Sequence, residues 1–136
     1  EAQVAAEALR KTGQHQAARR YYELAIETEP ERAAGYYGLA LALALEGKVD
    51  AAIPHLQKAV SLDPADADSH LLLGLLLQRA GQEAAASSSL ERAAKVHRLD
   101  LLTGRSLRGK LATLESVPGL GQAVEAYQAR LLTSGE

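Results

Sequence analysis

The chain has 136 residues, a formal net charge of -2, 47% hydrophobic residues and only 4% aromatic residues. The charge argues against a dedicated nucleic-acid binder, which needs a basic excess to neutralise phosphates. The absence of cysteine excludes disulfides, thiol nucleophiles and cysteine-based metal sites. No apolar stretch approaches the ~20 residues that a membrane span needs. Ala and Leu, the best helix formers, must build the core, so we expect an all-α protein.

The chain begins at Glu1 rather than Met. We therefore expect it to be a processed or excised piece, and the loss of a signal peptide or a flanking domain would leave no trace in it. A cysteine-free chain is compatible with either redox compartment, so the sequence does not identify the compartment.

Small and apolar residues recur at a fixed interval of 34 positions, beginning with Gly13, Gly47 and Gly81. A third proline at this interval would fall at position 98, where Arg98 stands. Self-similarity at one fixed period predicts a repeat architecture. The other sets at the same interval are Leu9, Leu43 and Leu77; Ala18, Ala52 and Ala86; Tyr22, Leu56 and Leu90; Ala25, Ala59 and Ala93; and Pro30 and Pro64.

Each repeat predicts two helices, which the second repeat shows best. Apolar residues at helical spacing over residues 36–43 predict a first helix that ends at Gly47, since glycine suits the left-handed residue after a helix. A second amphipathic run over residues 52–60 ends at Asp63 and Pro64, because the residue before proline disfavours the α region. We expect seven or eight helices in all and no sheet.

The residues after position 98 keep a weaker helical pattern. Leu107, Leu111 and Leu114 share one helical face, and residues 117–119 (Val-Pro-Gly) break the chain. A last amphipathic stripe follows at Leu120, Val124, Tyr127 and Leu131. We interpret these residues as a fourth, degenerate helix pair that covers the open end of the stack, as terminal repeats usually require.

The 34-residue pattern resembles the tetratricopeptide repeat, over about residues 1–98. In the second repeat the resemblance rests on Tyr36, Leu39, Ala40, Leu43, Gly47, Ala52, Leu56, Ala59 and Pro64. The third repeat departs from the family pattern at His70 and Arg98. The resemblance implies a right-handed α-solenoid of antiparallel helix pairs in one domain, residues 1–136. Its parts are repeat 1 at about 1–30, repeat 2 at about 31–64, repeat 3 at about 65–98 and degenerate capping helices at about 99–136.

The resemblance also implies a function, because first helices of such repeats line a concave groove that contacts another protein. The contact positions that it implies are Gln3, Val4, Glu7, Arg10 and Lys11 in the first repeat; Ala34, Tyr37, Gly38, Leu41 and Leu45 in the second; Asp68, Leu71, Leu72, Leu75, Gln78 and Arg79 in the third; and Arg105, Ser106 and Gly109 in the fourth. We expect the partner-binding groove to comprise Tyr37, Leu41, Leu45, Leu71, Leu72, Leu75, Gln78, Arg79 and Arg105.

Six leucines stand within residues 71–77, so this helix is apolar on every side. Leu73 should face the core, whereas Leu71, Leu72 and Leu75 should project into the groove. Burying a leucine is worth about 1.5–3 kcal/mol, so something should cover these three. The cover is a partner in our leading interpretation; the alternatives are neighbouring repeats and a C-terminal helix that folds back into the groove.

We therefore expect a protein-interaction scaffold or adaptor that binds an apolar helical or extended segment. The alternative is a self-assembling structural module. A nucleic-acid-binding repeat has weaker support, from the basic residues Lys95, Arg98, Arg105, Arg108 and Lys110 alone. We expect no enzyme activity, no cofactor and no metal site, because no phosphate loop or catalytic dyad occurs and none of the histidines, His15, His55, His70 and His97, stands at ligand spacing from an acid.

Overall fold

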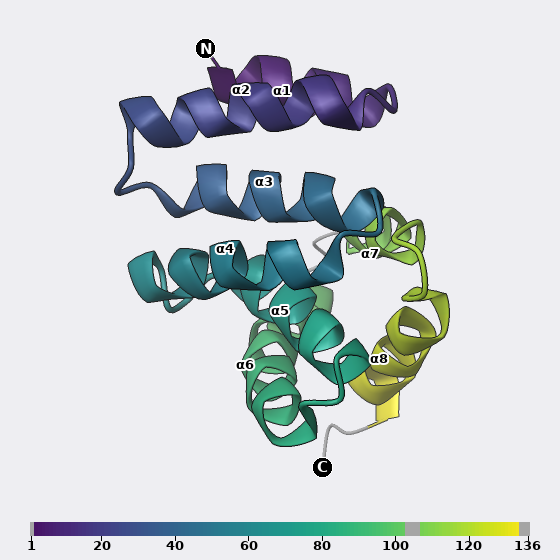
Figure 1. Ribbon diagram of the computed structural model, residues 1–136. Helices are drawn as coiled ribbons and strands as arrows, with labels where there is room; N and C mark the ends of the chain where they lie inside the picture. The colour runs from purple at the N-terminus through teal and green to yellow at the C-terminus, as the bar shows by residue number, and fades with distance from the viewer. Residues whose placement is uncertain (1, 103–106, 134–136) are drawn as a thin grey trace. The chain divides into compact units, whose positions relative to one another are not determined.

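The computed structural model describes residues 2–102 and 107–133, and this part of the chain contains eight α-helices and no strand (Figure 1). Consecutive helices form antiparallel pairs, which confirms the all-α prediction. No described helix has the length and apolar character needed to cross a membrane. The helices are α1 (Ala2–Lys11), α2 (His15–Thr28), α3 (Ala33–Leu45), α4 (Val49–Leu62), α5 (Ala67–Arg79), α6 (Glu83–Leu102), α7 (Arg108–Glu115) and α8 (Gly121–Thr133).

The chain divides into two compact units. Residues 1–65 form unit 1, which contains α1 to α4, and residues 66–136 form unit 2, which contains α5 to α8. In unit 1, α1 packs against α2, α2 against α3 and α3 against α4. In unit 2, α5 packs most extensively against α6, and α8 contacts both α6 and α7. Each unit is described below by itself.

The first helix of each repeat ends at a glycine in the left-handed conformation. Gly47 has φ 84°, and its N–H donates to the carbonyl of Ala44 while Lys48 N–H donates to the carbonyl of Leu43. These two bonds form the Schellman motif, which satisfies helix carbonyls that would otherwise lack a donor. Gly13 and Gly81 have φ values of 83° and 85°, so the 34-residue glycine period marks three equivalent helix ends, as predicted.

The ends of the second helices follow the proline pattern. Helix α4 stops at Leu62, just before Asp63 and Pro64. The next helix begins at once, because the Asp66 side chain accepts hydrogen bonds from Asp68 N–H and the Ser69 hydroxyl. Arg98 replaces the third proline, and α6 accordingly continues to Leu102 without a break.

Unit 1 has a core in which one aromatic ring fills the space left by a glycine. Tyr22 of α2 is 1% exposed, and a Cβ atom built on Gly38 of α3 would overlap its ring. The backbone of Gly38 therefore faces α2, and the implied assignment of Gly38 to partner contact is wrong. Tyr22 also accepts a hydrogen bond of 3.4 Å from the Arg10 guanidinium, which ties α2 to α1.

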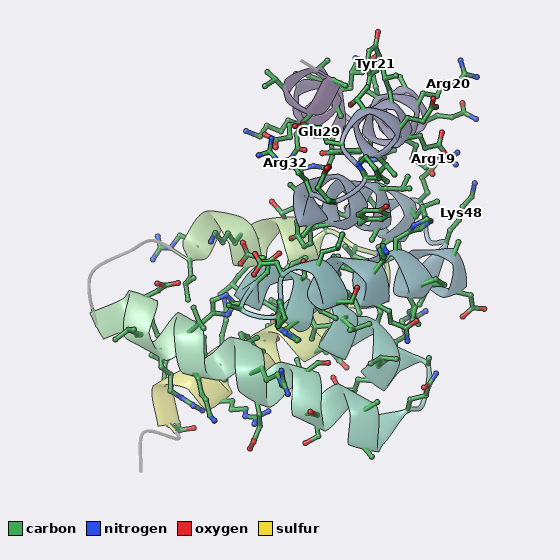
Figure 2. All side chains as sticks on the ribbon, turned by 90° about the vertical axis from the view of Figure 1, so that its left-hand side faces the viewer. Arg19, Arg20, Tyr21, Glu29, Arg32 and Lys48 are labelled. Carbon is green, nitrogen blue, oxygen red and sulfur yellow. The ribbon has the colours of Figure 1, made fainter. Side chains whose placement is uncertain are left out.

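Charged side chains of unit 1 gather on different edges. Arg19 of α2 pairs with Glu46 at the end of α3, with 2.7 Å between Nε and Oε1. Figure 2 shows Arg19, Arg20 and Lys48 on one side of this unit and the Glu29–Arg32 pair on the other. The basic edge and the Glu29–Arg32 edge are thus separate surfaces.

Candidate functional site

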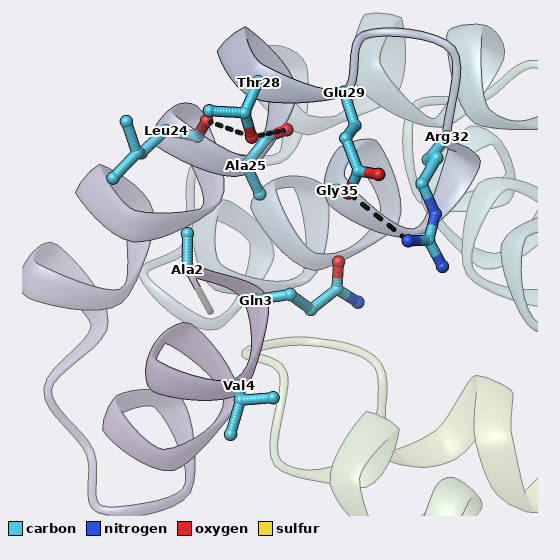
Figure 3. A pocket seen from close by; sticks show the side chains of 9 residues that line it. All are labelled: Ala2, Gln3, Val4, Leu24, Ala25, Thr28, Glu29, Arg32 and Gly35. Atoms are coloured by element: carbon cyan, nitrogen blue, oxygen red, sulfur yellow. Dashed lines mark hydrogen bonds and ion pairs between the residues drawn. The ribbon is translucent and has the colours of Figure 1, made fainter.

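A recess of about 440 Å³ opens in unit 1 where the start of α1 meets the end of α2 and the start of α3 (Figure 3). Gln3 and Val4, two positions that the repeat pattern implies for partner contact, contribute to its wall. A hollow of this size fits one or two side chains of a bound peptide. The lining residues are Ala2, Gln3, Val4, Leu24, Ala25, Thr28, Glu29, Arg32 and Gly35.

The wall of the recess combines exposed apolar side chains with fixed polar groups. Val4 is 65% exposed and Leu24 is 44% exposed. The Thr28 hydroxyl donates to main-chain carbonyls of its own helix, those of Leu24 at 3.2 Å and Ala25 at 3.1 Å, so its direction is fixed. Gln3 donates to Glu7 at 3.4 Å. Apolar walls with a few oriented polar groups are typical of ligand sites.

The segment of residues 27–32, which contributes Thr28, Glu29 and Arg32 to the recess, has an acidic balance. Glu29 and Arg32 form an exposed ion pair with 3.3 Å between Oε1 and Nη1, so the charge of Arg32 is offset within this segment (Figure 3). Glu27 precedes this pair in the sequence and Glu31 lies between its two members; both are exposed, although neither lines the recess. Residues 27–32 therefore carry a negative balance next to the recess, which favours a segment with basic side chains.

One position of the repeat differs between the first repeat and the later two, and sequence reasoning missed it. At the position of Leu24, the second and third repeats carry Lys58 and Arg92. The family pattern requires no apolar side chain there, since the two later repeats place a charge at the same point. Together with Val4, the other exposed large apolar residue of the wall, Leu24 gives the recess an apolar surface.

The predicted groove residues fall into three classes of exposure. In α3, Tyr37 and Leu45 are partly buried and Leu41 is buried. In α5, Leu71, Leu72 and Leu75 are 2%, 0% and 1% exposed, whereas Gln78 and Arg79 are exposed. Arg105 lies outside the described residues. The three leucines are therefore buried by other residues of the chain. Of the predicted groove residues on α5, only Gln78 and Arg79, near the end of the helix, reach solvent.

Two contacts of α5 with the C-terminal helix pair lie at the two ends of one helical face. Asp68, Leu72, Leu75 and Arg79 share this face, because residues separated by four, seven and eleven positions lie one above another on an α-helix. Asp68 pairs with Lys110 of α7, with 3.2 Å between Oδ2 and Nζ. The guanidinium of Arg79 lies against Gly119, between α7 and α8.

A polar network centred on a buried histidine joins three helices of unit 2, α5, α6 and α8. His97 of α6 is 1% exposed; its Nε2 lies 3.3 Å from Asp68 Oδ1 and its Nδ1 lies 2.7 Å from the Tyr127 hydroxyl of α8. A carboxylate only accepts, so Nε2–H donates to Asp68; in the neutral ring with this tautomer, Nδ1 accepts from Tyr127 O–H. Sequence reasoning missed this network, because Asp68 and His97 meet only through the packing of α5 on α6.

The electrostatics of the network favour the charged form of Asp68. The hydrogen bond from His97 is the main influence that lowers the pKa of Asp68, with Lys110 adding to it against the opposing effect of burial. Burial raises the pKa of Tyr127 well above its ordinary value. An acid, a histidine and a hydroxyl also occur together in nucleophilic enzymes, but here the histidine and the tyrosine are 1% and 3% exposed. No substrate reaches them, so the arrangement is structural.

A second cavity, of about 560 Å³, lies at the end of unit 2 where α6, α7 and α8 meet. Leu101 and Leu132 in its wall are 42% and 78% exposed. Within the described ranges, no group of three or more His, Asp or Glu side chains is placed to hold a metal ion. The other wall residues are Leu107, Arg108, Leu111, Gln128 and Leu131.

Two models of the tetratricopeptide repeat match this chain, one over residues 4–68 and the other over residues 43–111. Together they span the three repeats and the start of the C-terminal pair. No curated protein matches the chain. Both matches therefore assign the chain to one family. Neither match identifies a partner.

Proposed function

Since the chain belongs to the tetratricopeptide repeat family, we propose that it is an adaptor that binds an apolar helical or extended segment of another protein. A domain of this family is generally a protein–protein interaction module, and both family matches are to repeat models. The recess of unit 1 is the observation that carries the finer proposal. It is open, it has apolar walls, and it includes first-helix positions implied for partner contact.

The chemistry of the recess defines the segment that it accepts. Val4 and Leu24 provide apolar surface for one or two aliphatic or aromatic side chains. The acidic balance of residues 27–32, next to the recess, favours Lys or Arg beside those side chains. We therefore assign to this site a short segment with apolar anchors flanked by basic residues. We also assign Tyr37 and Leu45 of α3, a first helix of unit 1, to the partner-binding surface.

A peptide-display selection tests the proposal directly. A random library of peptides of about 16 residues is selected on the immobilised full chain, and enriched clones are then measured on two variants. Leu24→Glu places a carboxylate in the recess and should weaken binding by about tenfold or more, because the charge loses water without a partner. Val96→Glu is the matched control, since Val96 is a similarly exposed apolar residue (40%) on α6 of unit 2.

The result expected is a set of clones that carry apolar residues beside Lys or Arg and bind the control variant as well as the wild type. An absence of enriched clones would contradict the proposal. Clones that bind Leu24→Glu and the wild type equally would place binding elsewhere and reject the recess as the site.

Self-assembly is the second candidate, and the cavity of unit 2 favours it. Leu132, at 78%, is the most exposed of the large apolar residues described, and it stands in the cavity wall beside Leu101. Large exposed apolar side chains grouped at a cavity are typical of association surfaces. Sedimentation equilibrium of the wild type and Leu132→Glu distinguishes the candidates. An adaptor stays monomeric at micromolar concentration, whereas a self-assembling module forms oligomers that Leu132→Glu dissociates.

A further inference from the structure

We propose that the exposed face of α6 is an interaction surface for a second copy of this chain, and that it docks on the exposed face of α2 of that copy. Both α2 and α6 are second helices of their repeats. The inference rests on the proposed function in one respect, because this docking covers Leu24 of the recess. Contact between copies therefore limits the access of a partner segment to the recess.

The face of α6 combines exposed apolar side chains with unpaired positive charges. Val96 and Leu99 are 40% and 60% exposed. Arg92 and Lys95 are exposed too, and among the described residues neither of them has an ion-pair partner. The last three residues follow Arg92 by three, four and seven positions, so all four side chains lie on one side of the helix.

The face of α2 combines exposed apolar side chains with unpaired negative charges. Tyr21 and Leu24 are 42% and 44% exposed. Glu23 and Glu27 are exposed, and in the part of the chain that the structure describes they form no ion pair. Spacings of three and four residues make neighbours of these four side chains. Arg20 lies at the start of this face, so the negative charge belongs to the second half of α2.

Each face carries a pair of like charges that repel one another. Glu23 and Glu27 are four positions apart and Arg92 and Lys95 are three apart, and at these spacings helix side chains are neighbours. Glu27 also lies in the last turn of α2, where the helix dipole favours positive charge and no basic residue is present. A surface of opposite charge offsets these repulsions. The two faces are therefore complementary in charge, and both offer apolar side chains.

The repeat period relates the two faces to each other. Lys95 follows Glu27 by two periods of 34 residues, and Arg92 follows Leu24 by the same interval. Equivalent positions of two repeats thus carry an acidic, apolar face in one unit and a basic, apolar face in the other. A second copy of the chain brings both faces, so it is a partner with the chemistry that each face requires.

The contact should be weak, because each face offers only two large apolar side chains and two unpaired charges. This is far less than a standard interface of about 1,600 Å² contains, and exposed ion pairs add little. We expect a dissociation constant of about 0.1–1 mM, which leaves the chain monomeric at micromolar concentration. Copies held together by a partner with two binding segments reach an effective concentration in the millimolar range.

Sedimentation equilibrium of the full chain and of two charge-reversed variants tests the contact. The weight-average mass of the wild type should rise by about 1.5-fold or more between about 20 µM and about 1 mM. One variant carries Arg92→Glu with Lys95→Glu, and the other carries Glu23→Lys with Glu27→Lys. Each variant alone should stay monomeric. Their equimolar mixture should associate again, because the reversed face of each variant then meets an opposite charge on the other.

A matched control separates the contact from a general effect of net charge. Lys48→Glu with Lys58→Glu changes the net charge by the same amount at exposed positions of unit 1, and Lys58 occupies the repeat position of Arg92. This control should associate like the wild type. A wild type that stays monomeric at about 1 mM, a mixture that fails to associate, or a control that loses association would each overturn the proposal.

Two other outcomes are distinguishable from this contact. Association that persists in both reversed variants and is lost in Leu132→Glu would overturn the proposal and place the contact at the cavity of unit 2. A failed peptide selection would reject the recess as a binding site and leave the sedimentation result unchanged. A failed sedimentation test would likewise leave the peptide selection unchanged.

Discussion

The hydroxyl oxygen of Tyr127 lies 2.7 Å from Nδ1 of His97, and the two rings meet edge to face with their centroids 5.8 Å apart. This contact joins α6 to α8 across 30 residues of sequence. Both side chains are buried, so neither can exchange its partner for water. The contact therefore helps to hold α8 against α6.

Tyr127→Phe should lower the free energy of unfolding by about 1–3 kcal/mol, because it leaves a buried ring nitrogen of His97 without its donor. Urea denaturation followed by circular dichroism measures the change. Tyr21→Phe is the matched control, since Tyr21 is 42% exposed and its loss of a hydroxyl should change stability by less than about 0.5 kcal/mol. Equal effects of the two substitutions would show that the hydrogen bond to His97 contributes nothing.

Asp68 should make the stability of the chain depend on pH in the acid range. Its pKa is lowered in the folded state, chiefly by the hydrogen bond from His97. The carboxylate therefore contributes stability above the unfolded pKa of about 3.9, and this contribution is lost as the pH falls through the lower folded value. The stability difference between the wild type and Asp68→Asn should shrink between about pH 5 and pH 2.5. A difference that is constant over this range would contradict the assignment.

Gly47→Ala and Gly109→Ala should change stability in opposite directions. Neither added Cβ meets another atom within 4 Å, so both effects are conformational. Gly47 has φ 84°, where an alanine costs about 1–2 kcal/mol. Gly109 lies within α7, where alanine should stabilise by about 0.4–1 kcal/mol. Thermal unfolding of both variants checks this, and a shift of the same sign in both would be inconsistent with the helix end at Gly47.

Gly38→Ala should destabilise unit 1 by about 1–3 kcal/mol, because the new methyl group overlaps the buried ring of Tyr22. Tyr22→Leu vacates part of that space. In a double-mutant cycle, the Ala substitution should therefore cost less in the Tyr22→Leu background than in the wild type. Strict additivity of the two changes would show that the residues do not share a packing site.

The repeat was predictable because it rests on local rules. A glycine at a left-handed helix end and a proline after a helix constrain the backbone wherever they occur, so their 34-residue spacing placed the helices of the first three repeats. The third repeat has no proline to end its second helix. Arg98 stands at that position, and because arginine does not end a helix, α6 continues to Leu102.

The candidate sites were harder to predict, because they depend on which side chains meet after folding. The apolar run of α5 indicated a need for cover, and the structure shows Leu72 fully buried. Sequence patterns did not reveal the contact between Asp68 and His97, since the two residues are 29 positions apart. The recess of unit 1 depends on Leu24, a residue that the family pattern leaves unconstrained.

The most direct test of the adaptor account is an amide hydrogen-exchange footprint of the full chain with a peptide selected on it. The account predicts slower exchange at the start of α1, the end of α2 and the segment of residues 29–35, with the same peptide giving no footprint on Leu24→Glu. Protection confined to residues 66–133, or a footprint that persists on Leu24→Glu, would contradict the assignment of the recess as the binding site.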